Sequence, residues 1–162
     1  MNGANMVIKR TAIPAFFCLL ALGFGWCPGT GTEARAQDFT VNDTSGLIHA
    51  ISEPCASGES RTITLNPGIY AAADAVMDES VDPESFLIIN GDCTAITLNG
   101  LGDVVLDAEA ADAQYRVLDV QNGQTGPFVL NLTNLKIRNG EANSFGGGIF
   151  VRPGATTVNL TD

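Results

Sequence analysis

Short aliphatic runs, each closed by asparagine, glycine or aspartate, dominate the chain from residue 60 onward. Runs as short as these, with turn residues at their ends, are typical of β-strands. The pattern therefore predicts an all-β fold with almost no helix in this part of the chain. The expected strands lie at 62–65, 85–89, 95–98, 104–107, 116–120, 128–132, 135–138 and 149–151.

One of these segments repeats. The pattern at 129–134 returns at 157–162 and pairs Leu130 with Val158, Asn131 with Asn159, and Leu132 with Leu160. A repeat of roughly 28 residues falls in the range of solenoids, in which each turn of chain stacks on the previous one. Because side chains alternate along a strand, the inward positions would be Leu130, Leu132, Leu135 and Ile137. The outward positions would be Asn131, Lys136 and Arg138. The Asn-Gly dipeptides at 90–91 and 99–100 instead favour hairpins, so a β-sandwich is the alternative fold.

A short amphipathic segment precedes the strand-rich region. The pattern predicts a strand at Phe39–Val41 and then a helix at 47–51 with Leu47, Ile48 and Ile51 on one face. Ser45 is expected to cap its start, and Pro54 to end it. Since the end strands of a solenoid need covers, this helix is expected to be the N-terminal cap.

The first 36 residues have the features of a secretory signal peptide. Lys9 and Arg10 precede an uncharged run at 11–26, and the segment ends in the A-x-A motif of Ala34 to Ala36. A transmembrane anchor is the alternative, but the run is shorter than the roughly 20 residues needed to cross a bilayer. We expect cleavage after Ala36, which divides the chain into a signal peptide (1–36), a cap segment (37–61) and solenoid coils (62–162) that are incomplete at the C-terminal end.

The chain is strongly acidic, with 18 acidic and 8 basic residues and a net charge of −10. Loss of Lys9, Arg10 and Arg35 with the signal peptide would make it more acidic still. Such a chain lacks the Lys and Arg clusters that neutralise phosphates, so we expect no nucleic-acid partner. We also expect no cofactor, no metal and no transmembrane span in the mature chain.

Cleavage would leave Cys55 and Cys93 as the cysteines of the mature chain. In an oxidising compartment a pair of this kind is most simply a disulfide, which would stabilise the fold by roughly 3 to 4 kcal/mol. Two unrelated buried thiols are the alternative, because spacing alone does not show that the two Cα atoms are close enough.

Three consecutive glycines, Gly146, Gly147 and Gly148, come directly before the expected strand at 149–151. A phosphate-binding loop would need Gly-Lys-Ser/Thr leading into a helix, and a calcium-binding repeat would need an aspartate in register. A tight corner, where φ is positive or backbones crowd together, is the interpretation that we favour over a ligand-facing loop.

The order of Phe39–Val41, 47–51, 62–70, 135–140 and Gly146 to Ile149 resembles the N-terminal part of secreted bacterial right-handed parallel β-helix proteins. These belong to the pectin-lyase-like superfamily and are similar to polymorphic outer-membrane protein repeats. The resemblance implies a right-handed parallel β-helix with a short N-terminal cap helix. It also implies export to the extracellular space or to the cell envelope, at the outer membrane or cell surface. The superfamily includes lyases, hydrolases and adhesins, so the fold alone does not choose a function.

The residues favour an adhesive or structural role. An enzyme of this fold should carry paired carboxylates or an acidic cluster with a basic residue. The candidates are Asp103, Asp107, Asp119, Arg116 and Arg138, which we interpret as a solvated face. His49 is expected on the surface of the cap helix, so no catalytic residue is assigned. Outward Thr97, Asn131, Asn159 and Thr161 would bind a carbohydrate polymer or a cell-surface partner. A polysaccharide lyase or glycoside hydrolase of the same superfamily is the alternative.

Overall fold

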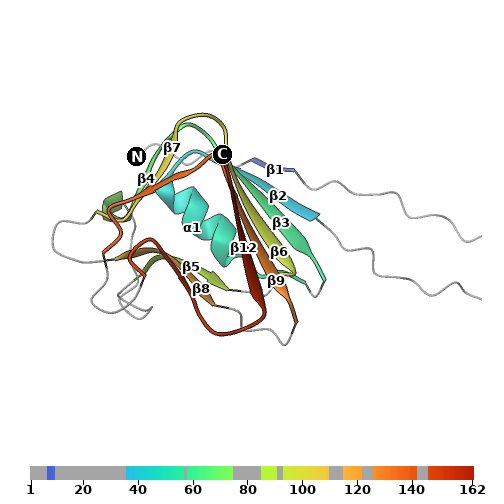
Figure 1. Cartoon of the computed structure of the whole chain (residues 1–162). Coiled ribbons are helices and arrows are strands. Elements are labelled where there is room, and N and C mark those ends of the chain that lie inside the picture. Colours follow the sequence, from blue (N-terminus) through green and yellow to red (C-terminus); the bar gives the residue numbers. More distant parts are fainter. Residues whose placement is uncertain are drawn as a thin grey trace, which may run out of the picture.

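The computed structural model describes residues 7–9, 36–56, 58–74, 85–90, 93–109, 115–121, 126–141 and 146–162. These residues are mostly strands with little helix, as the sequence predicts (Figure 1). The helical elements are α1 (Thr44–Ser52) and the 3₁₀ turn η1 (Ala72–Asp74). The strands are β1 (Val7–Lys9), β2 (Ala36–Val41), β3 (Ser60–Leu65), β4 (Gly68–Ala71), β5 (Ser85–Asn90), β6 (Ala95–Gly100), β7 (Val104–Asp107), β8 (Arg116–Gln121), β9 (Phe128–Thr133), β10 (Lys136–Arg138), β11 (Ile149–Val151) and β12 (Thr156–Thr161).

The strands form three sheets, and from β3 onward each strand pairs with the strand three places later in the chain. The six-stranded sheet has the order β1-β2-β3-β6-β9-β12, and the two three-stranded sheets have the orders β4-β7-β10 and β5-β8-β11. All pairs from β2 to β12 are parallel, and β1 joins β2 in the antiparallel sense. The β-sandwich alternative is therefore wrong, because its hairpins would pair neighbouring strands antiparallel.

The repeat found in the sequence lies in register in the structure. In the pairing of β12 with β9, Val158 lies opposite Leu130, Asn159 opposite Asn131, and Leu160 opposite Leu132. The sequence analysis did not predict β1, which lies within the expected signal peptide, or β4. The residues of β4 follow Asn66 and Pro67, and we took that turn to close β3 without recognising that a new strand begins at Gly68.

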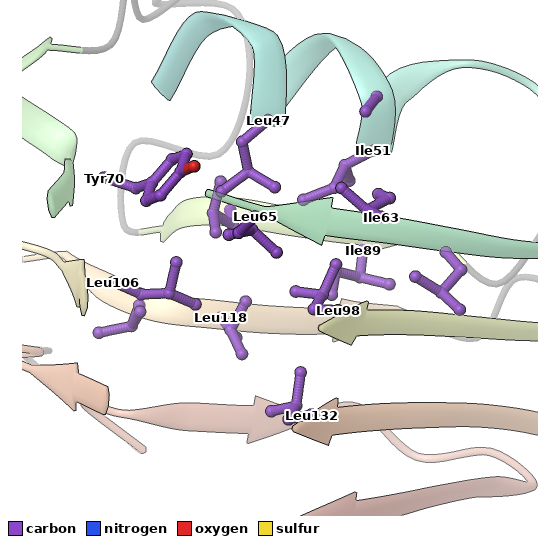
Figure 2. Packing of buried hydrophobic residues seen from close by; sticks show 14 of the residues in the cluster. Leu47, Ile51, Ile63, Leu65, Tyr70, Ile89, Leu98, Leu106, Leu118 and Leu132 are labelled. Atoms are coloured by element: carbon purple, nitrogen blue, oxygen red, sulfur yellow. The ribbon is translucent and has the colours of Figure 1, made fainter. Parts of the chain in front are cut away.

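The core lies between the three sheets and α1 (Figure 2). Along β9 the buried and half-buried positions alternate, with Phe128, Leu130 and Leu132 buried. Strands β7 and β8 differ, because they are buried at almost every position and therefore lack a simple inside–outside alternation. Leu135 and Ile137 pack against the core and remain partly exposed.

Helix α1 lies at one end of the stack and contacts β2, β3, β4 and β5. Its N-cap is Asp43, whose side chain accepts a hydrogen bond from the Gly46 N–H at 2.7 Å. The expected cap, Ser45, is wrong because it is already inside the helix, where its hydroxyl cannot reach an amide two or three residues ahead in cap geometry. The buried face consists of Thr44, Leu47, Ala50 and Ile51.

A buried arginine ties α1 to the first strands. Arg61 has an inward position on β3, and its Nη1 donates to the carbonyls of Ala50 at 2.9 Å and Ile51 at 3.2 Å. Its Nη2 donates to Gln37 Oε1 at 2.8 Å, and the guanidinium lies 5.4 Å from the ring centre of Phe39. Burial lowers the pKa of Arg61. The positive charge at the last helical carbonyls complements the helix dipole.

Cys55 and Cys93 form a disulfide, with their Cα atoms 5.1 Å apart. Cys55 lies in the segment after α1, and Cys93 lies in the turn before β6. The disulfide therefore links α1 to β6, which lies two strands beyond β2 in the six-stranded sheet. The alternative of two unrelated thiols is therefore wrong.

The N-terminal region is described only at Val7–Lys9, which pairs with β2. The rest of the expected signal peptide up to residue 35 lies outside the described residues, so its cleavage after Ala36 stays a prediction. Ala36 itself is the first residue of β2. In the described part of the chain, no helix has the length and apolar character that a membrane span requires.

Candidate functional site

The outward side of the six-stranded sheet carries two adjacent columns of small polar side chains. We call this set the polar face. The first column consists of Asp38, Thr62, Thr97, Asn131 and Asn159, which follow one another in register from β2 to β12. The second consists of Thr40, Thr64, Asn99, Thr133 and Thr161. All ten side chains are half-buried or exposed, whereas Ile63, Leu98 and Leu132 between them point into the core.

Hydrogen bonds between the strands order the first column. Asn159 Nδ2 donates to Asn131 Oδ1 at 2.8 Å, and Asn131 Nδ2 donates to Thr97 Oγ1 at 3.2 Å. Side chains held in this way lose little further rotamer freedom when a ligand binds. The repeated register of parallel strands thus produces an array of hydroxyl and amide groups, in which these bonds hold Thr97, Asn131 and Asn159 in place.

The polar face is almost uncharged, although the chain has a net charge of −10. Asp38, at the β2 end, is its charged member. The remaining positions are threonine and asparagine, which both donate and accept hydrogen bonds. Of the outward residues named from the sequence, Thr97, Asn131, Asn159 and Thr161 all lie on this face.

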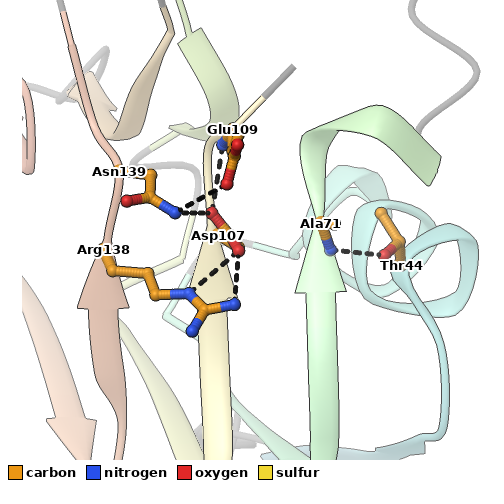
Figure 3. A network of polar contacts seen from close by, with 6 residues as sticks. All are labelled: Thr44, Ala71, Asp107, Glu109, Arg138 and Asn139. Atoms are coloured by element: carbon orange, nitrogen blue, oxygen red, sulfur yellow. Dashed lines mark hydrogen bonds and ion pairs between the residues drawn. The ribbon is translucent and has the colours of Figure 1, made fainter. Parts of the chain in front are cut away.

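Two of the acidic candidates, Asp107 and Asp119, are not solvated. Asp107 lies at the end of β7 and is only 5% exposed. Its Oδ2 accepts from Arg138 Nε at 2.9 Å and Nη2 at 2.8 Å, and its Oδ1 accepts from Asn139 Nδ2 at 2.8 Å (Figure 3). Burial raises the pKa of Asp107, but the hydrogen bonds from the Glu109 amide, Asn139 and Arg138 outweigh it and lower the pKa overall. This carboxylate is held as the anion by the next strand of its sheet.

Asp119 on β8 is held in a similar way and is fully buried. Arg152, just after β11, donates from Nε to Oδ1 at 3.1 Å and from Nη2 to Oδ2 at 2.6 Å. Gln121 Nε2 adds a hydrogen bond at 3.3 Å. Such two-point contacts are the strong form of the arginine–carboxylate pair. Asp107 and Asp119 therefore hold successive strands together, and neither presents a free carboxylate.

The other charged candidates do not gather into one site. Arg116 is buried, with its guanidinium 4.8 Å from the ring centre of Phe150. Asp103 is exposed and pairs with Lys136 at 2.7 Å, and the hydrogen bond and charge of Lys136 lower the pKa of Asp103. His49 lies on the exposed side of α1, with Nε2 3.3 Å from Glu53 Oε1. The solvated-face interpretation thus holds for Asp103 and is wrong for Asp107, Asp119 and Arg116.

The three glycines lie at a bend between Glu141 and β11, part of which is outside the described residues. Gly146 has a φ of +61°, in the left-handed region that favours glycine. The backbones of Gly147 and Gly140 pass so close together that a Cβ on either residue would overlap the carbonyl of the other. Gly148 has room for a side chain and an ordinary φ. Two of the three glycines therefore meet a backbone requirement.

No group of three or more His, Cys, Asp or Glu side chains that could hold a metal ion occurs in the described ranges. Searches against protein-family models, curated proteins and solved structures find no match to this chain.

Proposed function

We propose that this chain is an exported β-helix module of the cell surface or extracellular space that binds a neutral, hydroxyl-rich polymer through its polar face. On this proposal the three parallel sheets are the faces of one right-handed parallel β-helix. Support comes from the pairing of each strand, from β3 onward, with the strand three places later in the chain. The right-handed sense follows the strong preference of crossovers between parallel strands.

The observation that carries the binding function is the pair of in-register columns on the polar face. Neighbouring strands repeat about every 4.8 Å, and side chains on one face repeat about every 6.6 Å along a strand. Hydroxyl and amide groups at these intervals can make many equivalent hydrogen bonds to a ligand that is itself periodic. Each bond contributes only about 1 kcal/mol net, so the proposal needs a long ligand that engages several strands at once.

The charge distribution favours a neutral ligand. A polyuronate or a nucleic acid would approach a chain of net charge −10 against electrostatic repulsion, with Asp38 at the edge of the face. A neutral polysaccharide meets no such barrier, and its hydroxyl groups match the donors and acceptors of threonine and asparagine.

Two observations count against the lyase or hydrolase alternative. Asp107 and Asp119, the buried carboxylates among the candidates, are already bound by Arg138 and Arg152. His49 lies on the exposed side of α1, where it is paired with Glu53. It is distant from Asp107 and Asp119 in sequence and lies on a different element.

The test is co-sedimentation of the protein with insoluble neutral polysaccharides, cellulose and chitin, compared with crosslinked polygalacturonate. Binding to a neutral polymer should fall strongly when Thr133→Glu adds a charge to the polar face. Ile69→Glu is the matched control, because Ile69 is 57% exposed on β4 of another sheet. Binding that is equal in both variants, or absent in the unmodified protein, would contradict the proposal. Growth of ultraviolet absorbance on incubation with polygalacturonate would favour a lyase instead.

A further inference from the structure

The side chain of Gln37, near the start of β2, is held by a buried arginine. Arg61 Nη2 donates to Gln37 Oε1 at 2.8 Å, and the two residues are register partners in the pairing of β2 with β3. Because a guanidinium only donates hydrogen bonds, this contact requires the oxygen of the Gln37 amide, and not its nitrogen, to face Arg61. The amide carbonyl of Gln37 is therefore bound by a cation that is only 1% exposed.

Arg61 is itself fixed by other contacts. Its Nη1 donates to the carbonyls of Ala50 and Ile51, and its guanidinium lies 5.4 Å from the ring centre of Phe39. A positive donor that is held in place stabilises negative charge that develops on the oxygen it binds, as an oxyanion hole does. Since the bound oxygen belongs to an amide, the contact favours nucleophilic attack on the side-chain carbonyl of Gln37.

Cleavage of the expected signal peptide would supply the nucleophile. A cut after Ala36 makes Gln37 the first residue of the mature chain, with a free α-amino group. An α-amino group has a pKa of about 8, so part of it is uncharged and nucleophilic at neutral to mildly alkaline pH. In an N-terminal glutamine this nitrogen closes a five-membered ring when it attacks Cδ of its own side chain. The amine and the polarised amide would thus belong to one residue.

We propose that Gln37 of the exported chain cyclises to pyroglutamate, with Arg61 as the group that polarises its amide. The α-amino nitrogen forms a bond to Cδ, and the bond between Cδ and Nε2 breaks. The amide nitrogen takes up the proton that the attacking amine releases and leaves as ammonia, so no oxidant or co-reactant is needed. The inference rests on the export and cleavage in the proposed function and is independent of polymer binding.

The product fits this position better than the open N-terminus does. Oε1 of Gln37 becomes the lactam oxygen and can still accept from Arg61. Burial lowers the pKa of Arg61 against the opposing effect of Glu53 and Glu59, so a positive charge is already costly there. An α-ammonium group on the residue paired with Arg61 would add a second positive charge. Cyclisation removes that charge and keeps the hydrogen bond.

The first experiment compares the reaction in the folded and unfolded protein. Signal peptidase added to the full chain creates the Gln37 terminus at a defined time, and mass spectrometry of the N-terminal peptide then follows the loss of one ammonia. Cyclisation should be at least about tenfold faster in native protein than in urea, because one oxyanion donor contributes about 10²- to 10³-fold in enzymes. An equal or slower rate in native protein overturns the inference and leaves export intact. A chain that is not cut after Ala36 overturns the inference together with the proposed export.

The second experiment assigns the effect to Arg61. Arg61→Met removes the donor and should slow cyclisation of the native protein by about tenfold or more. Lys136→Met, at an exposed basic residue on β10, is the matched control and should react like the unmodified protein. Gln37→Glu lacks the amide nitrogen and should release no ammonia. Unchanged cyclisation in folded Arg61→Met overturns the inference. If Arg61→Met does not fold, the comparison of native and urea-unfolded protein still decides.

Discussion

The two ends of the strand stack share the same inward columns but differ in what covers them. At the β2 end, Phe39 is buried although it lies on one of the first strands, because β1 pairs with β2, and α1 and Arg61 pack against that end. At the β12 end the equivalent residue, Leu160, is 67% exposed. The exposure of a residue in an inward column therefore depends on whether another element packs over it. Its position within its own strand does not decide this.

The largest expected change in the free energy of unfolding comes from leucine-to-alanine substitutions along the inward column of Leu98, Leu132 and Leu160. Leu98→Ala and Leu132→Ala should each lower the free energy of unfolding by about 2 to 5 kcal/mol, because each empties a covered core position. Leu160→Ala should change it by no more than about 0.5 kcal/mol. Chemical denaturation measures all three. A loss at Leu160 as large as at Leu132 would mean that the β12 end is covered after all.

The sequence predicts the repetitive part of this stack well. Each expected strand is present, and the match of 129–134 to 157–162 predicts the pairing of β9 with β12 residue by residue. The reason is that short aliphatic runs with regular turns constrain both the element type and the stacking offset. The disulfide also agrees with the sequence-based expectation, in which loss of the first 36 residues would leave Cys55 and Cys93 as the cysteines of the mature chain.

The sequence predicts the charged residues poorly. On β7 Asp107 ends an aliphatic run, and on β8 Asp119 interrupts one, and both positions are compatible with a carboxylate that points to solvent. They are buried because Arg138 and Arg152, more than thirty positions later, return beside them on the next strands. The role of Arg61 was not predicted for a related reason. It donates to backbone carbonyls of α1, and the sequence does not show which carbonyls need a donor.

The second effect concerns the link between the covering helix and the sheet. The double variant Cys55→Ser with Cys93→Ser removes a bridge between residues 38 positions apart. In the chain-entropy model this lowers the free energy of unfolding by about 4 kcal/mol. Reduction of the unmodified protein should reproduce that loss, whereas the same reductant should leave the double variant unchanged. An unaltered denaturation midpoint would show that the helix covers its end without help from the disulfide.

The third expected effect is a loss of folding stability at alkaline pH, caused by Tyr70 near the α1 end of the stack. Tyr70 is buried there, and its hydroxyl lies 3.0 Å from the carbonyls of both Val41 and Asn66. Burial raises the pKa of Tyr70 to about 12, against about 10 in an unfolded chain. Between about pH 10 and about pH 12, the Tyr70 hydroxyl therefore stays protonated in the folded state and loses its proton in the unfolded state. Its contribution of about 2 to 3 kcal/mol is fully present below pH 10 and disappears as the pH rises toward 12.

Tyr70→Phe separates this contribution from other alkaline effects. At neutral pH the variant should be less stable by about 1 kcal/mol, because the two carbonyls lose their donor. Between pH 9 and 11 its stability should decline less steeply than that of the unmodified protein, as followed by urea denaturation at each pH. Parallel curves for the two proteins would contradict a raised Tyr70 pKa.

The smallest expected change in stability concerns the N-cap of α1. Asp43→Ala removes the side-chain acceptor for the Gly46 N–H and should lower the free energy of unfolding by about 1 kcal/mol. Ser45→Ala is the matched control. It lies two residues further on, is exposed, and should have almost no effect because alanine is a good helix former. The sequence alone favours the opposite order, with Ser45 as the cap, so denaturation of the two variants compares the two assignments directly.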